Sequence, residues 1–285
     1  MNINNIQRRQ QKHRLLWSEN AAVIEHREIL KKLEIMEYQY DYDDFVKEYL
    51  PFYSDEYWSI LTKEKQKLFL SFGWFMYNLK TIIIEQSALT EYCKIILSGQ
   101  SSFSFTRDFI HRIAQVQVDE TYHTLMSYKG IELCSRLADY NLDFFPDTDL
   151  ATYIFSLNTL PPQDKELAWL ALTTVCEATI SKYLAILPNE KNVQPAFRFI
   201  TDMHRQDEAS HSSLFIDLMV VAKNELDDII YQKLIGFIKK SVEILMSPDK
   251  NSWDHLHALV GVVPPDFVNP QYKNLYSFRS IEKFM

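Results

Sequence analysis

The sequence predicts an all-α protein with a four-helix bundle at its core and additional N- and C-terminal helices. Only 5 of its 285 residues are glycine, which is few for a β-rich or loop-rich protein, and 47% are apolar, which is enough for a substantial core. Four long segments with a helical pattern follow one another, separated by proline, glycine, serine and asparagine. At ~1.5 Å rise per residue, each segment is long enough to span a small domain.

The two ends of the chain flank this bundle. Residues 7–48 are highly charged and are predicted to be helical, with His13 and His26 as solvated surface histidines. The tail contains Pro264-Pro265 and several aromatic residues, and we expect it to wrap the bundle in an irregular conformation.

The first two long helices are predicted over residues 63–97 and 105–140. Between them, Ser98-Gly-Gln-Ser-Ser102 combines a helix stop with capping residues for the next helix. The second helix is expected to end before Asn141 and Pro146, because asparagine and proline interrupt the pattern there.

The second half of the chain begins with a short predicted helix over residues 149–157, after which Pro161-Pro162 breaks the chain. Two more long helices are predicted over residues 163–187 and 193–224, followed by an amphipathic helix over residues 225–246. No linker is long or polar enough to divide the chain, so residues 1–285 are predicted to be one domain.

Charge and composition limit the partners that the protein could bind and the compartment in which it is expected. A net charge of -8 argues against a nucleic acid. The polar N-terminus lacks the apolar stretch of a secretion signal, and no apolar run approaches the roughly 20 residues that a membrane span needs. Three unpaired cysteines are expected to be reduced core thiols, and the cytoplasm is the expected location; they are Cys93, Cys134 and Cys176.

The motif Asp-Glu-x-x-His occurs twice, at Asp119-Glu120…His123 and at Asp207-Glu208…His211. Residues i and i+3 point the same way on a helix, so each copy offers a carboxylate and an imidazole on one face. Two such helices, together with one glutamate from each of two more, make up the ligand set of a carboxylate-bridged di-metal site. A single Glu-x-x-His is weak evidence, because it often arises by chance in chains of this size.

Both further glutamates have candidates. Glu85 and Glu177 each lie near the middle of a predicted helix among apolar residues, where a carboxylate is costly to bury unless it is paired or bound to metal. A lone glutamate of this kind often pairs with a buried lysine or arginine. The order Glu, Glu-x-x-His, Glu, Glu-x-x-His favours the metal site.

A third histidine joins the set, because His204, Glu208 and His211 form one stripe at i, i+4 and i+7. The other histidines fit less well. His111 is expected to point away from the site, and His255 and His257 are expected to serve as caps or surface contacts.

The aspartates before each motif glutamate, Asp119 and Asp207, are expected to support the ligands. A ligating imidazole usually donates its other N–H group to a carboxylate or a carbonyl. Ordinary surface acids are the alternative.

The pattern His-x-x-x-Glu-x-x-His, added to the other motif, resembles the di-iron arylamine N-oxygenases of the p-aminobenzoate N-oxygenase family, which have a ferritin-like fold. The resemblance covers the four long helices and implies a site of seven ligands with three histidines. It implies that Glu120 and Glu208 bridge two irons. It places Glu85, Glu120 and His123 around one iron, and Glu177, His204, Glu208 and His211 around the other.

The resemblance implies that a reduced di-iron centre activates O2 and transfers oxygen to an amine nitrogen, giving a hydroxylamine and then nitroso or nitro compounds. The substrate would be a small-molecule amine, free or bound to a carrier, in natural-product biosynthesis. The cofactors implied are two iron ions, with O2 as co-substrate and an external electron donor. No catalytic residues are expected beyond the metal ligands.

Three related classes of di-iron or iron-binding protein are alternatives. A ribonucleotide-reductase small subunit should carry a radical tyrosine about one turn after the first motif histidine, where this chain has Ser127, and Tyr122 is expected to point off the metal face. A non-catalytic ferritin-like iron-binding protein usually has fewer histidine ligands. A di-iron carbon hydroxylase or desaturase of the same fold is the main alternative.

Residues one turn from the ligands and on the same faces are expected to line the substrate pocket. None is charged, which suits a neutral amine or a substrate whose charged end lies elsewhere; they are Asn78, Gln117, Thr173, Thr174, Ser181 and Thr201. The choice between iron and manganese, the identity of the amine and the electron donor stay open at this point. So does the oligomeric state, with a homodimer as the working expectation.

Overall fold

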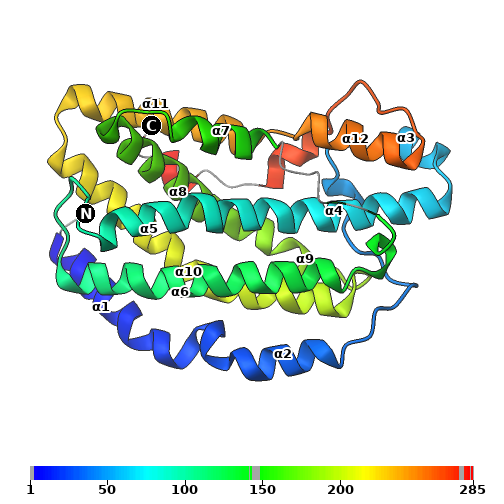
Figure 1. Cartoon of the computed structure of the whole chain (residues 1–285), viewed down its shortest axis with the longest axis horizontal. Coiled ribbons are helices and arrows are strands. Elements are labelled where there is room, and N and C mark those ends of the chain that lie inside the picture. Colours follow the sequence, from blue (N-terminus) through cyan, green and yellow to red (C-terminus); the bar gives the residue numbers. More distant parts are fainter. Residues whose placement is uncertain (1–2, 141, 143–147, 276–278, 283, 285) are drawn as a thin grey trace.

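Four long helical segments run side by side through the protein (Figure 1). The computed structural model describes the chain except for residues 1–2, 141, 143–147, 276–278, 283 and 285. The segments are α4 (Lys63–Ile84) with its continuation α5 (Thr90–Leu97), then α6 (Arg107–Glu132), α8 (Pro162–Leu184) and α10 (Pro195–Glu225). The expected all-α, ferritin-like bundle is confirmed.

The bundle helices begin where side chains can cap them. Thr62 accepts a hydrogen bond from Lys65 N at the start of α4, and Thr106 accepts one from Phe109 N at the start of α6. Pro195 occupies the first turn of α10, where its missing N–H group costs nothing. These caps explain why the starts of the helices were predicted more closely than some of the ends.

Helix α8 is the central helix and packs against α10 and α11 (Asp228–Leu245). By length and composition, Pro162–Asn189 is apolar enough to cross a membrane, so the prediction that no apolar run approaches such a length is wrong. However, 82% of its most apolar window is buried inside the protein, as expected for the core helix of a bundle. Helix α9 (Ile186–Asn189) continues the chain after α8.

One helix ends earlier than predicted. Residues 105–140 were expected to be helical, but α6 ends at Glu132, and a 3-10 turn, η4 (Ser135–Leu137), follows. Within this turn Arg136 donates a hydrogen bond of 3.0 Å to the buried carboxylate of Asp44. Such a long-range ion pair favours a bend here over the helix that local propensity predicts.

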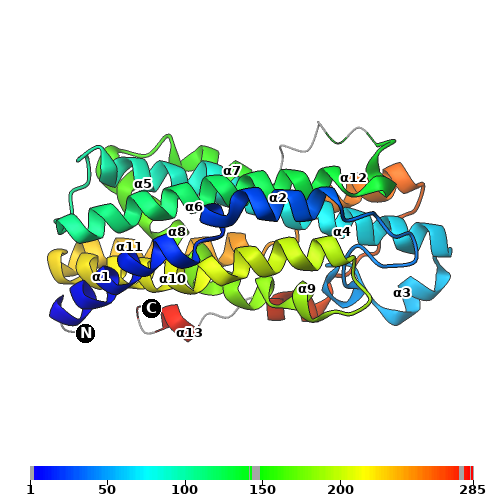
Figure 2. The ribbon, with the colours of Figure 1, turned by 90° about the horizontal axis from the view of Figure 1, so that it is seen from below.

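The N-terminal part is helical only in places. Helix α1 (Ile3–Asn20), the 3-10 turn η1 (Ala22–Glu25) and α2 (His26–Glu34) precede an irregular stretch, in place of the helix predicted over residues 7–48. His26 is exposed and His13 is partly exposed. Figure 2 shows α1 and α2 lying along α6 and α10.

The C-terminal tail is less irregular than predicted. Helix α12 (Lys250–Val260) forms there and ends at Gly261, whose φ of 67° lies in the left-handed region that glycine adopts easily. His257 was expected to be a cap or a surface contact, but it is 1% exposed, and its ring centroid lies 4.5 Å from that of Phe52. His255 is exposed, as expected.

Short elements complete the fold. Helix α7, predicted over residues 149–157, is present with these bounds. The rest are η2 (Lys47–Tyr49), α3 (Asp55–Ile60), η5 (Pro270–Leu275) and α13 (Arg279–Glu282). The three cysteines are free and buried.

Candidate metal centre

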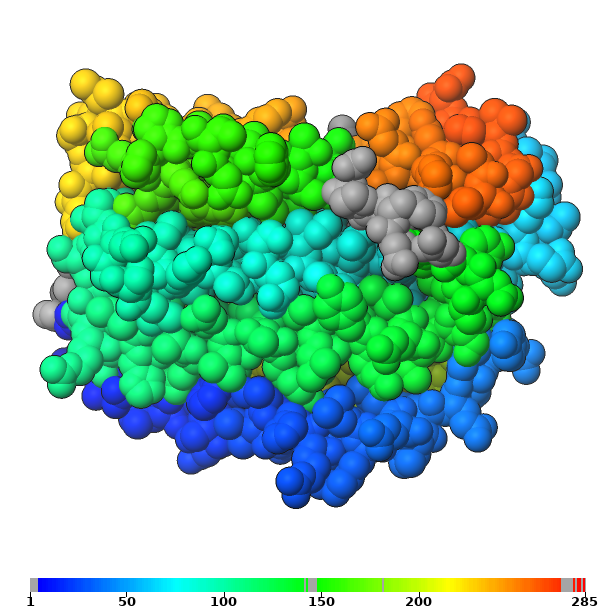
Figure 3. All heavy atoms as spheres, viewed as in Figure 1, coloured from blue at the N-terminus to red at the C-terminus, as the bar shows by residue number. Residues whose placement is uncertain are grey.

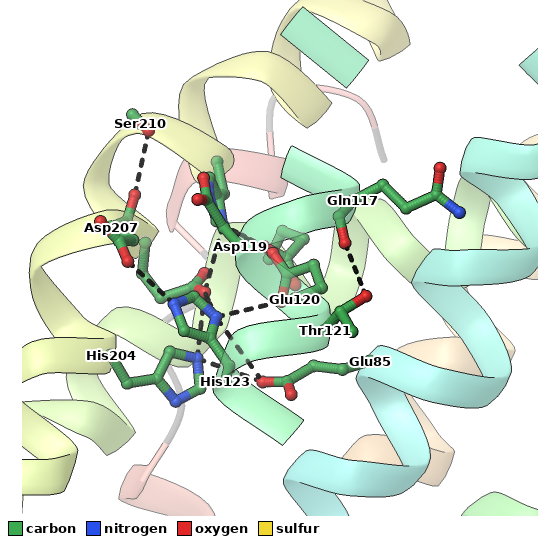
Figure 4. Close-up of polar contacts among 12 residues, drawn as sticks. Glu85, Gln117, Asp119, Glu120, Thr121, His123, His204, Asp207 and Ser210 are labelled. Atoms are coloured by element: carbon green, nitrogen blue, oxygen red, sulfur yellow. Dashed lines mark hydrogen bonds and ion pairs between the residues drawn. The ribbon is translucent and has the colours of Figure 1, made fainter. Parts of the chain in front are cut away.

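Four glutamates and three histidines meet in the middle of the bundle. Figure 4 labels Glu85, Glu120, His123 and His204 among them. Glu85 comes from the junction of α4 and α5, Glu120 and His123 from α6, Glu177 from α8, and the rest from α10. Each of the seven residues is at most 4% exposed; they are Glu85, Glu120, His123, Glu177, His204, Glu208 and His211. The structure thus brings together all seven residues that the sequence pattern singled out.

The ligand atoms form two adjoining groups. In the first, atoms of Glu85, Glu120, His123 and His204 lie within 4.8 Å of one another. In the second, atoms of Glu120, His123, Glu208 and His211 do the same. Glu177 lies at the edge of the second group, with its Oε2 3.9 Å from His211 Nδ1. Two adjoining groups that share Glu120 and His123 have the form of a site for two ions.

His204 lies on the opposite side of the centre from the one expected. The resemblance implied that it joins Glu177 and His211, but its Nε2 lies 3.3 Å from Glu85 Oε1, and its ring centroid lies 4.1 Å from that of His123. The reason is the length of the stripe on α10. His204 and His211 are seven residues apart, about 10 Å along a helix axis, so they fall on opposite sides of Glu208.

Glu208 is therefore placed between two imidazoles. Its Oε1 lies 3.0 Å from His204 Nε2 and 3.3 Å from His211 Nδ1. Glu120 is placed similarly from the opposite helix, with Oε2 3.2 Å from His123 Nδ1 and Oε1 2.7 Å from His211 Nδ1. The central positions of Glu120 and Glu208 suit carboxylates that bridge two ions.

Glu85 lies at the start of a single π turn, η3 (Glu85–Leu89), which joins α4 to α5. The extra residue of a π turn locally widens the helix, and such turns are frequent at functional sites. Thr90 donates a hydrogen bond of 2.8 Å to the backbone oxygen of Glu85, and Thr124 donates one of 3.1 Å to its side chain. The sequence analysis predicted one continuous helix over residues 63–97 and did not predict this turn.

The two aspartates pair with the histidines across the motifs. Asp207 Oδ2 lies 3.0 Å from Nε2 of His123, and Asp119 Oδ2 lies 3.1 Å from Nε2 of His211. An ionised carboxylate can only accept, so each Nε2 carries the proton and each Nδ1 faces the glutamates. This arrangement leaves the Nδ1 lone pairs directed at the position where ions would bind.

Burial and mutual repulsion change the protonation of the glutamates. Burial, followed by the nearby charge of Glu120, raises the pKa of Glu85 well above its usual value. Burial and the charge of Glu208 do the same to the pKa of Glu177. Burial alone would also raise the pKa of Glu208, but His211 and hydrogen bonds from His204 and His211 hold it well below the usual value.

The donor atoms fit a pair of divalent cations. Buried oxygens without a hydrogen-bond partner among the described residues occur on all four glutamates; they are Glu85 Oε1, Glu120 Oε1, Glu177 Oε2 and Glu208 Oε2. Glu120 Oε1 is close to His211 Nδ1 but lies outside the direction of a hydrogen bond. Leaving such atoms unpaired is costly. Two divalent cations would balance the four carboxylate charges, and carboxylates with imidazoles suit iron.

Arg112 is a component of this region that the sequence reasoning missed. It is 1% exposed, its Nη1 lies 4.0 Å from Asp119 Oδ2, and it donates a hydrogen bond to the hydroxyl of Ser210. Burial lowers its pKa, against the attraction of Asp119 and Asp207. Arg112 lies seven residues before Asp119, two turns along the same face of α6, and this spacing was a signal that could have been used.

The residues expected to line the pocket differ in whether a polar atom is left for a substrate. Thr173 and Thr201 are buried, but their hydroxyls donate to carbonyls of their own helices at 2.8 Å and 2.9 Å. Asn78 is fully buried and donates to Trp74 O, while its Oδ1 has no hydrogen-bond partner within the described part of the chain. Asn78 therefore keeps an acceptor that a bound molecule could use.

The remaining pocket candidates have no side-chain atom that is clearly available to a substrate among the described residues. Thr174 is buried, with its hydroxyl 3.5 Å from Phe215 O. Gln117 is half-buried, and its amide points away from the cluster in Figure 4, so a role in the pocket stays a prediction. The side chain of Ser181 lies outside the described residues.

Other expectations concern residues near the motifs. Ser127 is buried at the position where a radical tyrosine would be expected, and the hydroxyl of Tyr122 is directed to the backbone of His26. His111 is exposed, away from the cluster.

Two comparisons with known proteins bear on the chain. A family model described as P-aminobenzoate N-oxygenase AurF matches residues 35–274, which include all four bundle helices. The chain is also 26% identical over 211 residues to a 4-aminobenzoate N-oxygenase of Streptomyces thioluteus. That match covers 71% of this chain and 61% of the relative, so the chain spans less than two thirds of the relative's length.

Proposed function

The chain belongs to the p-aminobenzoate N-oxygenase AurF family, and from this premise we propose that it is a di-iron N-oxygenase acting on a small aromatic amine. The observation that carries the proposal is the pair of adjoining ligand groups with three imidazoles, buried at the centre of the bundle. Neither comparison favours a carbon hydroxylase, a desaturase or an iron store.

The seven side chains divide between two ions. Glu85, His123 and His204 would hold one ion, and Glu177 and His211 the other, with Glu120 and Glu208 shared. When bound, the iron pair would supply the activation of O2 and the transfer of oxygen. Asp119 and Asp207 would hold the Nε2 protons of His211 and His123, so that each imidazole presents Nδ1.

The surrounding protein would exclude bulk water from the reaction. All seven ligands are nearly inaccessible to solvent, which strengthens every charge interaction at the centre. Asn78, seven residues before Glu85, offers a buried oxygen acceptor with no hydrogen-bond partner among the described residues, which could bind a substrate N–H group.

The substrate class follows from the relative, whose name specifies 4-aminobenzoate. The balanced first step takes an aromatic amine, O2, two electrons and two protons to an arylhydroxylamine and water. An external two-electron donor must supply the electrons, and repeated oxidation would lead to nitroso and nitro products. Free and carrier-bound amines, the cytoplasmic location and the homodimer stay predictions.

Metal analysis and turnover test the proposal. Protein loaded anaerobically with Fe(II) should contain two iron ions per chain. With O2, a reductant and 4-aminobenzoate or a related arylamine, it should form a product heavier by one oxygen atom, with that atom derived from ¹⁸O2. A single bound zinc ion, or oxygen transfer to carbon only, would refute the proposal.

A further inference from the structure

The N-terminal segment, residues 3–34, lies outside the residues that match the family model, yet it contacts both aspartates that pair with histidines of the centre. We call α1, η1 and α2 the N-terminal cover. Figure 2 shows the cover lying over both α6 and α10, the two helices that carry the Asp-Glu-x-x-His motifs, and Figure 3 shows it as a continuous strip along one side of the molecule.

The cover donates one hydrogen bond to each supporting aspartate. The indole Nε1 of Trp17 lies 2.8 Å from both carboxylate oxygens of Asp119. The backbone N–H of Ala22 lies 3.3 Å from both carboxylate oxygens of Asp207. The contact of Trp17 is the shorter of the two, and it is made by a side chain that can be changed.

Each contact leads to a ligand through one further hydrogen bond. Trp17 holds Asp119, which holds Nε2 of His211 at 3.1 Å, and His211 presents Nδ1 to the glutamates. Hydrogen bonds to a ligand's partner fix the orientation of that ligand and its affinity for metal.

Asp119 also has a competing partner. Nη1 of Arg112 lies 4.0 Å from Asp119 Oδ2, and both Nη1 and Nε of this buried guanidinium have no hydrogen-bond partner within the described part of the chain. A small rotation of the Asp119 carboxylate toward Arg112 would form a charged hydrogen bond and break the one to His211. The indole of Trp17 holds both carboxylate oxygens and opposes this rotation.

The cover is anchored independently of Trp17. Gln10 donates a hydrogen bond of 2.7 Å to the fully buried Asp217 on α10, and Arg9 pairs with the same carboxylate. Arg14 pairs with Asp108 at 2.9 Å. Loss of the indole N–H group alone should therefore leave the cover in place.

We propose that Trp17 is a positioning residue for one of the two metal ions. It holds Asp119 on His211 and so supports the ion bound by His211 and Glu177, while the ion on the side of Glu85 and His204 is unaffected. This inference rests on the proposed di-metal function, but not on the N-oxygenation itself.

The test is a stepwise metal titration of the full chain with Co(II), followed by absorption of the bound metal and by competition with a chelator. Trp17→Phe keeps an aromatic ring and removes the N–H donor. We expect one of the two binding steps to weaken about tenfold, the lower end of the effect of such partners, with a changed Co(II) spectrum for that step only. Because Co(II) binding needs no turnover, a failure of N-oxygenation would leave this test intact.

Gln10→Ala is the matched control, because it loosens the same helix without touching the centre. It should lower the melting temperature and leave both binding steps and both spectra unchanged. Asp119→Asn, which leaves the cover intact, should weaken the same step as Trp17→Phe and serves if that variant does not fold. The proposal would be overturned if Trp17→Phe weakened both binding steps equally, or if it bound Co(II) as tightly as wild type. It would also be overturned if Gln10→Ala weakened the same step. Wild-type protein that binds fewer than two ions would refute the di-metal function instead.

Discussion

His123 donates its Nε2 proton to Asp207 on the facing helix, at 3.0 Å, and not to the aspartate of its own motif. The reciprocal bond joins His211 to Asp119 at 3.1 Å. Each motif therefore supplies a ligand to its own side of the centre and a supporting carboxylate to the other side. The two helices are tied together by these crossed bonds, and the position of one determines the orientation of the imidazole on the other.

The crossed pairing predicts which ion each aspartate supports. Asp207→Asn should lower the affinity for the ion held by His123, His204 and Glu85 by roughly 10- to 100-fold, because Asp207 orients the imidazole of His123. Stepwise Co(II) titration of Asp207→Asn beside Glu85→Gln and Glu177→Gln identifies the affected step. If the loss instead matches that of Glu177→Gln, the pairing in solution follows the motifs and is not crossed.

The position of His204 predicts which metal-binding step its removal weakens. His204→Ala should weaken the same binding step as Glu85→Gln, since His204 Nε2 lies 3.3 Å from Glu85 Oε1. The fold should survive, and oxygen transfer should slow in proportion to the lost ion. Circular dichroism, metal titration and turnover on one preparation measure all three. Full activity per folded molecule would show that His204 is only a core residue.

Much of the centre was predictable because metal ligands follow helical spacing. Glu120 and His123, like Glu208 and His211, are related by i and i+3, and this relation holds in any helix. Glu85 and Glu177 stood out because a lone carboxylate in an apolar face needs a partner. The bounds of the long helices, apart from the C-terminal end of α6, followed in the same way from caps and prolines.

The remainder depends on how helices are rotated and placed relative to one another. No spacing within α6 or α10 shows that Asp207 pairs with His123, because that pairing depends on the rotation of both helices. That His204 lies beside Glu85 depends on the level at which α10 packs against the junction of α4 and α5. The contact of Trp17 with Asp119 joins residues 102 positions apart. By contrast, α12 was missed although Trp253, Leu256 and His257 follow helical spacing.

Alanine in place of glycine should have opposite effects on stability at Gly130 and at Gly236. A Cβ atom at Gly130 would lie 2.7 Å from Trp74 Cζ2, on a ring that is stacked against Phe197 with centroids 4.2 Å apart. Because that ring has no room to move, Gly130→Ala should destabilise the protein by about 1–3 kcal/mol. Gly236, inside α11, has nothing within 4 Å of a Cβ, so Gly236→Ala should stabilise by about 0.5–1 kcal/mol. Thermal melts of both variants measure this, and equal effects of the two would contradict the packing argument.

The raised pKa values of Glu85 and Glu177 predict how the metal-free protein responds to pH. Burial holds both carboxyls protonated in the folded state at pH values where they ionise in the unfolded chain. The folded state therefore binds more protons, so this contribution to stability is complete below the unfolded pKa and is lost as pH rises through the folded pKa. The melting temperature of metal-free protein should fall as pH rises from about 4.5, the ordinary value for glutamate.

Glutamine substitutions separate this effect from other causes. The side chains introduced by Glu85→Gln and Glu177→Gln cannot ionise, so each variant should melt at a higher temperature than metal-free wild type, by an amount that grows with pH. Bound cations compete with these protons, so the rise in melting temperature that Fe(II) produces under argon should also grow with pH for wild type and shrink in both variants. Melts at several pH values, with and without Fe(II), measure both quantities. If both substitutions destabilise the metal-free protein and leave the iron-induced rise intact, the two glutamates are structural partners of other groups and do not bind metal.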